Sequence, residues 1–267
     1  MKLLIEILLL LALEGGLSAQ ELFVKTEPAS NMAKGTIGLR LNSEFIPSYK
    51  KLGWRLAPEI MLGINRNLMV HASFYGSSIY QTSFEPEGAS LYAKYRILAL
   101  DDIRSHFRIA TFTRFSLIHN PVPYAEINLQ GDNSGFQTGI VLTQLIHKLA
   151  LSATTNYDHA THNLNEHINL LENKNQIAYS ISAGYLLFPK TYRDYKQINL
   201  NLYLEFLGKS SLDGFGSFID MAPSIQFIFG SRTRLDFSYE RQIAGDLSRI
   251  SNIQFLTRLE YTLFNVL

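Results

Sequence analysis

Alternation of apolar and polar side chains along nearly all of the chain after residue 34 constrains the fold more than any other feature. Successive side chains of a β-strand point to opposite faces of a sheet, so a period of two predicts strands with one apolar face. Between residues 107 and 117, for example, the odd positions carry apolar or threonine side chains, whereas Arg108 and Arg114 lie on the other face. The pattern predicts an all-β protein.

The predicted strands are unusually long. There are about twelve of them, most with about ten residues or more, whereas strands of globular proteins average about five or six and membrane-crossing strands need about 9–11. Hydrophobic residues make up 46% of the chain. No apolar run after residue 20 approaches the roughly 20 residues of a spanning helix, so the apolar content is distributed by alternation. Only residues 135–146 are apolar on both faces, which leaves their orientation open.

Short and long connections alternate between the predicted strands. The short ones lie near residues 65–67, 101–104, 146–147, 189–196 and 230–232, and the long ones near 45–53, 76–88, 118–134, 158–175, 208–217 and 243–251. An even strand number with this alternation is typical of bacterial outer-membrane barrels. We therefore predict a closed antiparallel transmembrane β-barrel over residues 34–267, with short periplasmic turns and long external loops, in the outer membrane of a Gram-negative bacterium.

A soluble barrel or sandwich is the alternative to a membrane barrel. Its apolar faces would point inward, and it would have to accommodate Arg40, Arg55 and Glu59 beside them. Charged side chains are rarely buried without a partner. In a bilayer, by contrast, the apolar faces point to lipid and closure removes every unpaired sheet edge. These arguments favour the membrane barrel.

The first 33 residues differ from the rest of the chain. Residues 1–19 resemble an export signal peptide, with Lys2, an apolar stretch from Leu3 to Leu13, and Ala19 at the predicted cleavage site. A membrane anchor is the alternative, but the apolar run is too short to span a bilayer. Residues 20–33 are predicted to form a periplasmic segment that either narrows the barrel mouth or lies along its rim.

Several stretches of sequence resemble known outer-membrane proteins. Tyr261, Leu263 and Leu267 share the apolar face of the last strand, as in the terminal assembly signal of such barrels. Residues 26–32, 35–40, 90–96, 101–108 and 131–135 resemble poorly characterised outer-membrane transporters that are loosely grouped with phenol-degradation MetA-type channels. The resemblance implies a barrel that transports solutes, and it names no substrate.

The polar face of the predicted strands carries charged candidates for the wall of a pore. They are Arg40, Arg55, Glu59, Lys94, Arg96, Arg108, Arg114, Arg234, Glu240 and Arg258. Because basic groups predominate, a channel for passive transport of small solutes with a preference for anions is the first hypothesis. Alternatively, these charges pair across neighbouring strands and fill the interior. The second functional hypothesis is a non-conducting barrel whose external loops bind a ligand, a metal ion or a partner.

One predicted loop contains several possible metal ligands. Imidazole and carboxylate groups suit zinc, nickel or copper, and the candidates are His159, His162, Glu166 and His167. A polar loop in solvent is the alternative interpretation.

Other functional classes find little support. The chain has no cysteine, which removes disulfides, thiolate metal sites and cysteine nucleophiles. A formal net charge of +1 does not suggest a nucleic-acid partner. No serine and histidine can be placed together with an orienting third group, so an enzyme is not expected. We expect no cofactor, and outer-membrane lipid and small solutes as partners, while the oligomeric state stays open.

Overall fold

The structure is a computed structural model that describes residues 23–47, 51–102, 105–164, 173–190 and 197–266. Its regular elements are strands, and the described residues include no helix that could span a membrane. The strands are β1 (Ile37–Pro47), β2 (Leu52–Gly63), β3 (Leu68–Ser77), β4 (Glu85–Asp101), β5 (Ser105–Ile118), β6 (Gly135–Ile146), β7 (Leu149–Ala160), β8 (Asn175–Phe188), β9 (Asn199–Ser211), β10 (Ser217–Phe229), β11 (Thr233–Gly245) and β12 (Ile253–Leu263).

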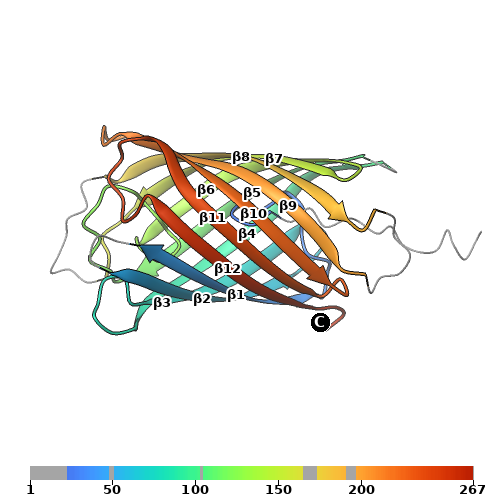
Figure 1. Ribbon diagram of the computed structural model, residues 1–267, viewed down its shortest axis with the longest axis horizontal. Coiled ribbons are helices and arrows are strands. Elements are labelled where there is room, and N and C mark those ends of the chain that lie inside the picture. Colours follow the sequence, from blue (N-terminus) through green and yellow to red (C-terminus); the bar gives the residue numbers. More distant parts are fainter. Residues whose placement is uncertain (1–22, 48–50, 103–104, 165–172, 191–196, 267) are drawn as a thin grey trace, which may run out of the picture.

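The strands form one closed barrel in which every strand pairs antiparallel with its neighbours in sequence, and β1 also pairs with β12 (Figure 1). In the closing pair, Arg40 lies opposite Glu260 and Leu39 lies opposite Tyr261. Closure leaves no strand edge without a partner, which a bilayer requires. The predicted closed barrel of about twelve strands is confirmed.

The two ends of the barrel differ in their connections. At the end we call the short-turn end, residues 64–67, 102–104, 147–148, 189–198 and 230–232 join the strands. At the long-loop end the connections are residues 48–51, 78–84, 119–134, 161–174, 212–216 and 246–252. The connection between β1 and β2 has fewer residues than the sequence suggested, because β1 continues to Pro47 and β2 begins at Leu52.

The outer surface of the barrel is apolar, as the alternation predicts. Leu91, Leu117 and Ile181 are 65%, 64% and 66% exposed, and each points away from the interior. Such a continuous apolar belt is unusual on a protein that faces water, whereas it is the normal surface of a barrel in lipid. The structure therefore contradicts the alternative of a soluble barrel with inward apolar faces.

The inward faces carry mainly polar and charged side chains. Most of the charged ones are nearly fully buried and lie in ion pairs with neighbours on adjacent strands or on segments inside the barrel. Two such segments enter the lumen. One is the N-terminal segment, residues 23–34, and the other is the β5–β6 loop, residues 119–134; together they determine the shape of the interior.

Candidate functional site: the lumen

The N-terminal segment crosses the lumen and is held there by a carboxylate. Glu205 of β9 is fully buried, and its Oε1 accepts the backbone N–H groups of Val24 and Lys25 at 3.0 and 2.7 Å. Its Oε2 accepts the N–H and the hydroxyl of Thr26 at 3.0 and 2.7 Å. Hydrogen bonds to a charged acceptor are about twice as strong as neutral ones, so Glu205 is the main anchor of this segment.

Ionic contacts fix the same segment to other strands. Lys25 Nζ lies 2.7 Å from Glu240 Oε2 on β11. Glu27 pairs with Arg40 of β1 at 2.7 Å and with Lys94 of β4 at 3.6 Å. Since these strands lie on different sides of the barrel, residues 25–27 are tied across the lumen.

Two further hydrogen bonds reach the main chain of the segment. Lys94 Nζ donates to the carbonyl oxygen of Pro28 at 2.7 Å, and Ala29 N–H donates to Thr143 Oγ1 of β6 at 2.8 Å. The segment that the sequence placed either in the barrel mouth or along its rim thus extends into the interior.

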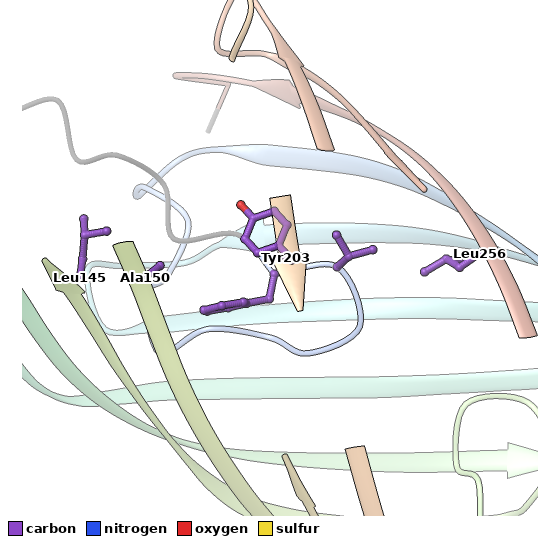
Figure 2. Close-up of a cluster of buried hydrophobic side chains, with 6 residues drawn as sticks. Leu145, Ala150, Tyr203 and Leu256 are labelled. Carbon is purple, nitrogen blue, oxygen red and sulfur yellow. The ribbon is translucent and has the colours of Figure 1, made fainter. Parts of the chain in front are cut away.

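Apolar packing completes this arrangement. Phe23 packs edge-on against Tyr203, with ring centroids 5.6 Å apart, and forms a buried cluster with Val24, Leu145, Ala150 and Leu256. Figure 2 shows the labelled members of this cluster converging from β6, β7, β9 and β12. Burial of a large apolar side chain contributes about 1.5–3 kcal/mol, so Phe23 adds appreciably to docking.

The cluster also explains why residues 135–146 are apolar on both faces. Leu145 faces the N-terminal segment, and Val141 packs with Ala29, Tyr92 and Phe112. The outward face of β6 carries exposed apolar side chains such as Ile140. The inward face of this strand is apolar because it packs against the N-terminal segment and the rings beside it.

The β5–β6 loop crosses the long-loop end of the barrel. The N–H groups of Ala125 and Glu126 donate to the carbonyl oxygen of Ser248 at 3.1 and 2.9 Å. Ser248 belongs to the β11–β12 loop, which lies diametrically opposite in the closed strand order. The β5–β6 loop therefore spans the full width of the opening.

Buried arginines hold this loop at both of its sides. Arg249 pairs with Glu126 at 3.2 Å and with Asp220 at 2.6 Å. Burial alone would lower the pKa of Arg249, but Glu126 and Asp220 outweigh it and raise the pKa above its ordinary value. At the other side, Arg55 pairs with Asp132 and approaches Gly131, so the loop is fixed at both edges.

Gly131 is needed where Arg55 meets the loop. Its φ is +119°, a conformation that residues with a side chain rarely adopt. A Cβ at this position would also lie 2.8 Å from the Arg55 guanidinium carbon. Glycine thus permits the close approach that the buried ion pair requires.

Cavities lie on both sides of the N-terminal segment in the lumen, and we call them the chamber and the vestibule. The chamber has a volume of about 240 Å³ and lies between this segment and the β5–β6 loop, with Lys25, Glu27, Arg114, Glu126, Thr154 and Arg249 in its wall. The vestibule has a volume of about 470 Å³ and lies toward the short-turn end, with Arg40, Arg66, Arg96, Arg108 and Glu260 in its wall. Glu27 lines both cavities, so the N-terminal segment is the partition between them.

The structure places all of the charged candidates from the sequence on the inward side of the barrel. Arg114, Glu240 and Arg258 line the chamber, and Arg40, Arg96 and Arg108 line the vestibule. Arg55, Glu59, Lys94 and Arg234 are nearly fully buried.

Most of these candidates take part in ion pairs. Arg40 contacts Glu59 at 3.1 Å and Glu260 at 2.8 Å in addition to Glu27, and Arg234 contacts Asp236 at 3.0 Å. An open ring of free guanidinium groups is therefore absent from the described residues, because carboxylates neutralise most of the inward arginines.

Sequence reasoning missed the residues that organise the lumen. Alternation places Glu205 on the inward face of its strand but does not identify it as an anchor, and Glu126 and Arg249 fall in predicted connections. Alternation predicts which way a strand residue points, whereas it carries no information about a loop that folds back over the opening. The apolar inward face of β6 was the one signal that something occupies the interior.

The proposed metal-binding loop is described only in part. His159 Nδ1 lies 3.0 Å from the side-chain oxygen of Asn175, and His162 is exposed. Glu166 and His167 lie outside the described residues. Within the described ranges no three metal-ligating side chains come together, and the complete four-residue hypothesis stays a prediction.

Comparison with solved structures identifies the fold. The KdgM porin shares 8% identity, with 84% of this chain and 98% of that chain covered and a TM-score of 0.55. An outer membrane channel from Pseudomonas putida F1 shares 10% identity, with 90% and 100% covered and a TM-score of 0.54. The NanC porin shares 12% identity, with 85% and 98% covered and a TM-score of 0.50. This chain has the fold of the outer-membrane porins.

Comparison by sequence gives no assignment. No protein-family model matches the chain, and no curated protein matches it. The narrower resemblance to phenol-degradation channels therefore stays a prediction.

Proposed function

We propose that this protein is an outer-membrane channel for passive movement of small solutes, with its short turns in the periplasm and no enzymatic activity. The observation that carries the proposal is the tandem arrangement of the chamber and the vestibule along the lumen, on the two sides of the N-terminal segment. Both cavities have charged and polar walls, which suit hydrated solutes rather than lipid.

The same arrangement limits the size of the solute. The β5–β6 loop narrows one entrance and the N-terminal segment narrows the middle, so the route favours molecules that fit a chamber of about 240 Å³. A modest preference for anions is part of the proposal. It is supported by Arg114, the one basic side chain of the described chamber wall that lacks an ion pair.

A non-conducting barrel is the second candidate. It is favoured by the two segments that cross the lumen, because their contacts are those of packed protein rather than of an open pore. In that case the exposed loops of the long-loop end would carry the function.

Single-channel recording in a planar bilayer tests the proposal. We expect the refolded mature protein to give small ohmic steps, and a variant that lacks residues 20–33 to give larger ones, because removal of the partition joins the two cavities. Silence of both proteins, each shown separately to be folded, would contradict a channel. A silent full-length protein with a conducting deletion variant would favour the second candidate.

A further inference from the structure

We infer that the chamber contains a binding site for a small hydroxylated carboxylate, such as a hydroxy acid or a sugar acid, with Arg114 as the carboxylate-binding group. This inference deepens the proposed channel function and rests on it for its biological role.

Arg114 is the one chamber cation with free capacity. The described basic side chains of the chamber wall are Lys25, Arg114, Lys209, Arg249 and Arg258. All of them except Arg114 lie within 4 Å of a carboxylate oxygen. The described acidic side chains of the wall are all paired as well, namely Glu27, Glu44, Glu126, Asp220 and Glu240. The charge of Arg114 is therefore left for a ligand.

The guanidinium group of Arg114 is oriented but not satisfied. Its Nη1 donates to Ser90 Oγ at 3.1 Å and to Tyr75 OH at 3.3 Å, and its carbon lies 5.1 Å from the centre of the Tyr92 ring. Arg114 is only 7% exposed, and its Nε is buried without a hydrogen-bond partner among the described residues. A buried polar group without a partner destabilises the protein, so a bound anion at this place would relieve a penalty.

Hydrogen-bond acceptors lie beside Arg114 on the next two strands. Gln137 faces Arg114 across the β5–β6 pair. The amide nitrogens of Gln137 and Asn156 both donate to Asp158 Oδ1, at 2.9 and 2.7 Å. Because the amide nitrogens are engaged in these bonds, the carbonyl oxygens of the two side chains are left to accept hydrogen bonds from the hydroxyl groups of a ligand.

A hydroxyl group of the protein completes this wall. Thr154 Oγ1 is buried, lines the chamber and has no partner among the described residues. A guanidinium group, two amide oxygens and a hydroxyl on one wall match a ligand that carries one carboxylate and several hydroxyl groups. Tyr92 and Phe112, whose rings lie 5.7 Å apart, provide an apolar surface for the carbon skeleton of such a ligand.

Direct binding tests this inference independently of conductance. Sodium glucuronate and glucose are titrated into the detergent-refolded protein by isothermal titration calorimetry, because the two sugars differ in the carboxylate and share the ring. We expect glucuronate to bind more tightly than glucose in the wild-type protein. Arg114→Gln should weaken glucuronate binding at least about tenfold and leave the affinity for glucose unchanged.

Two further variants keep the test decisive. Thr154→Val retains the shape of the side chain and should weaken the binding of both sugars. Lys148→Gln removes a positive charge from the short-turn end and should leave both affinities unchanged. Equal affinity of the wild-type protein for the two sugars, or no binding of either, would overturn the carboxylate site. Conductance without selective glucuronate binding would support the channel proposal and contradict the binding site. Selective glucuronate binding without conductance would support the binding site and contradict the channel proposal.

Discussion

The carboxylate of Glu205 accepts the backbone N–H of Val24 at 3.0 Å, although the two residues are 181 positions apart in the sequence. Lys25 and Thr26 donate to the same carboxylate, so three successive N–H groups of the N-terminal segment converge on one side chain. Docking of the segment thus depends chiefly on a single buried anion.

Glu205→Gln should release the N-terminal segment. The new amide can accept through one oxygen only, and its nitrogen would face N–H donors, which weakens docking by about 3 kcal/mol. We expect trypsin to cleave after Lys25 about a hundredfold faster than in the wild-type protein, and single-channel conductance to increase. Asn201→Ala is the matched control, because Asn201 lies on the same strand and bonds Gln226 instead. Unchanged cleavage in the Glu205 variant would contradict this anchoring role.

The N-terminal segment should stay docked in the lumen at mildly acidic pH. Burial alone would raise the pKa of Glu27, but Arg40 and Lys94 outweigh it and hold the pKa well below the ordinary value of 4.5. A carboxyl group with a lowered pKa stabilises the folded form above its unfolded pKa and loses this effect as the pH falls through the folded pKa.

Conductance measured against pH checks this expectation. Because other carboxyl groups line the chamber, conductance is compared with that of Glu27→Gln at each pH. The difference between the two proteins should stay constant from about pH 7 to 4.5 and disappear only at lower pH, when Glu27 takes up a proton. Loss of this difference already near pH 6 would show that another group controls the segment.

Arg249→Ala should loosen the β5–β6 loop. The substitution removes the cation that pairs with the buried Asp220, whereas Glu126 and Glu240 keep Lys209 and Lys25; breaking such a buried pair costs about 3–5 kcal/mol. Faster proteolysis within residues 119–134 and a lower melting temperature are the expected results. Arg232→Ala, in an exposed turn, serves as the control. If the loop stays equally protected in both variants, the ion pairs do not hold it.

Arg96→Glu combined with Arg114→Glu should shift ion preference toward cations. The first residue lines the vestibule and the second the chamber, so the double variant reverses charge in both parts of the proposed route. We expect a several-fold change in the permeability ratio, read from the reversal potential under a salt gradient. An unchanged reversal potential would remove these arginines from the route.

Ile181→Arg tests the lipid-facing surface. Ile181 is 66% exposed and lies near the middle of β8. An arginine at the bilayer midplane destabilises a barrel by about 2–4 kcal/mol, whereas on a surface in water it would be nearly neutral. Urea unfolding in lipid vesicles measures the difference. Leu212→Arg, in the β9–β10 connection, should have little effect, and equal stability of both variants would contradict a membrane belt there.

Alternation predicted the barrel because lipid and lumen impose opposite demands on successive residues. Leu117 and Ile181 point outward and Arg40 and Arg114 inward, as the pattern required. The arrangement of the segments inside the lumen could not be predicted from this alternation. Whether Glu205 meets a backbone N–H group or water depends on where residues 23–34 lie, and no period in the sequence encodes that position.

Because Glu205 and Thr143 bind backbone N–H groups, part of the contact between the barrel wall and the N-terminal segment does not depend on the side chains of that segment. Every residue except proline supplies such a donor. At residues 24–26 and 29, any substitution except proline therefore keeps the backbone hydrogen bond, although it changes the ion pair of Lys25, the hydroxyl contact of Thr26 or the packing of Val24 and Ala29. The barrel thus holds its insert partly through the backbone of the insert, so a change of one side chain leaves these hydrogen bonds in place and alters the lining of the cavities without remodelling any strand.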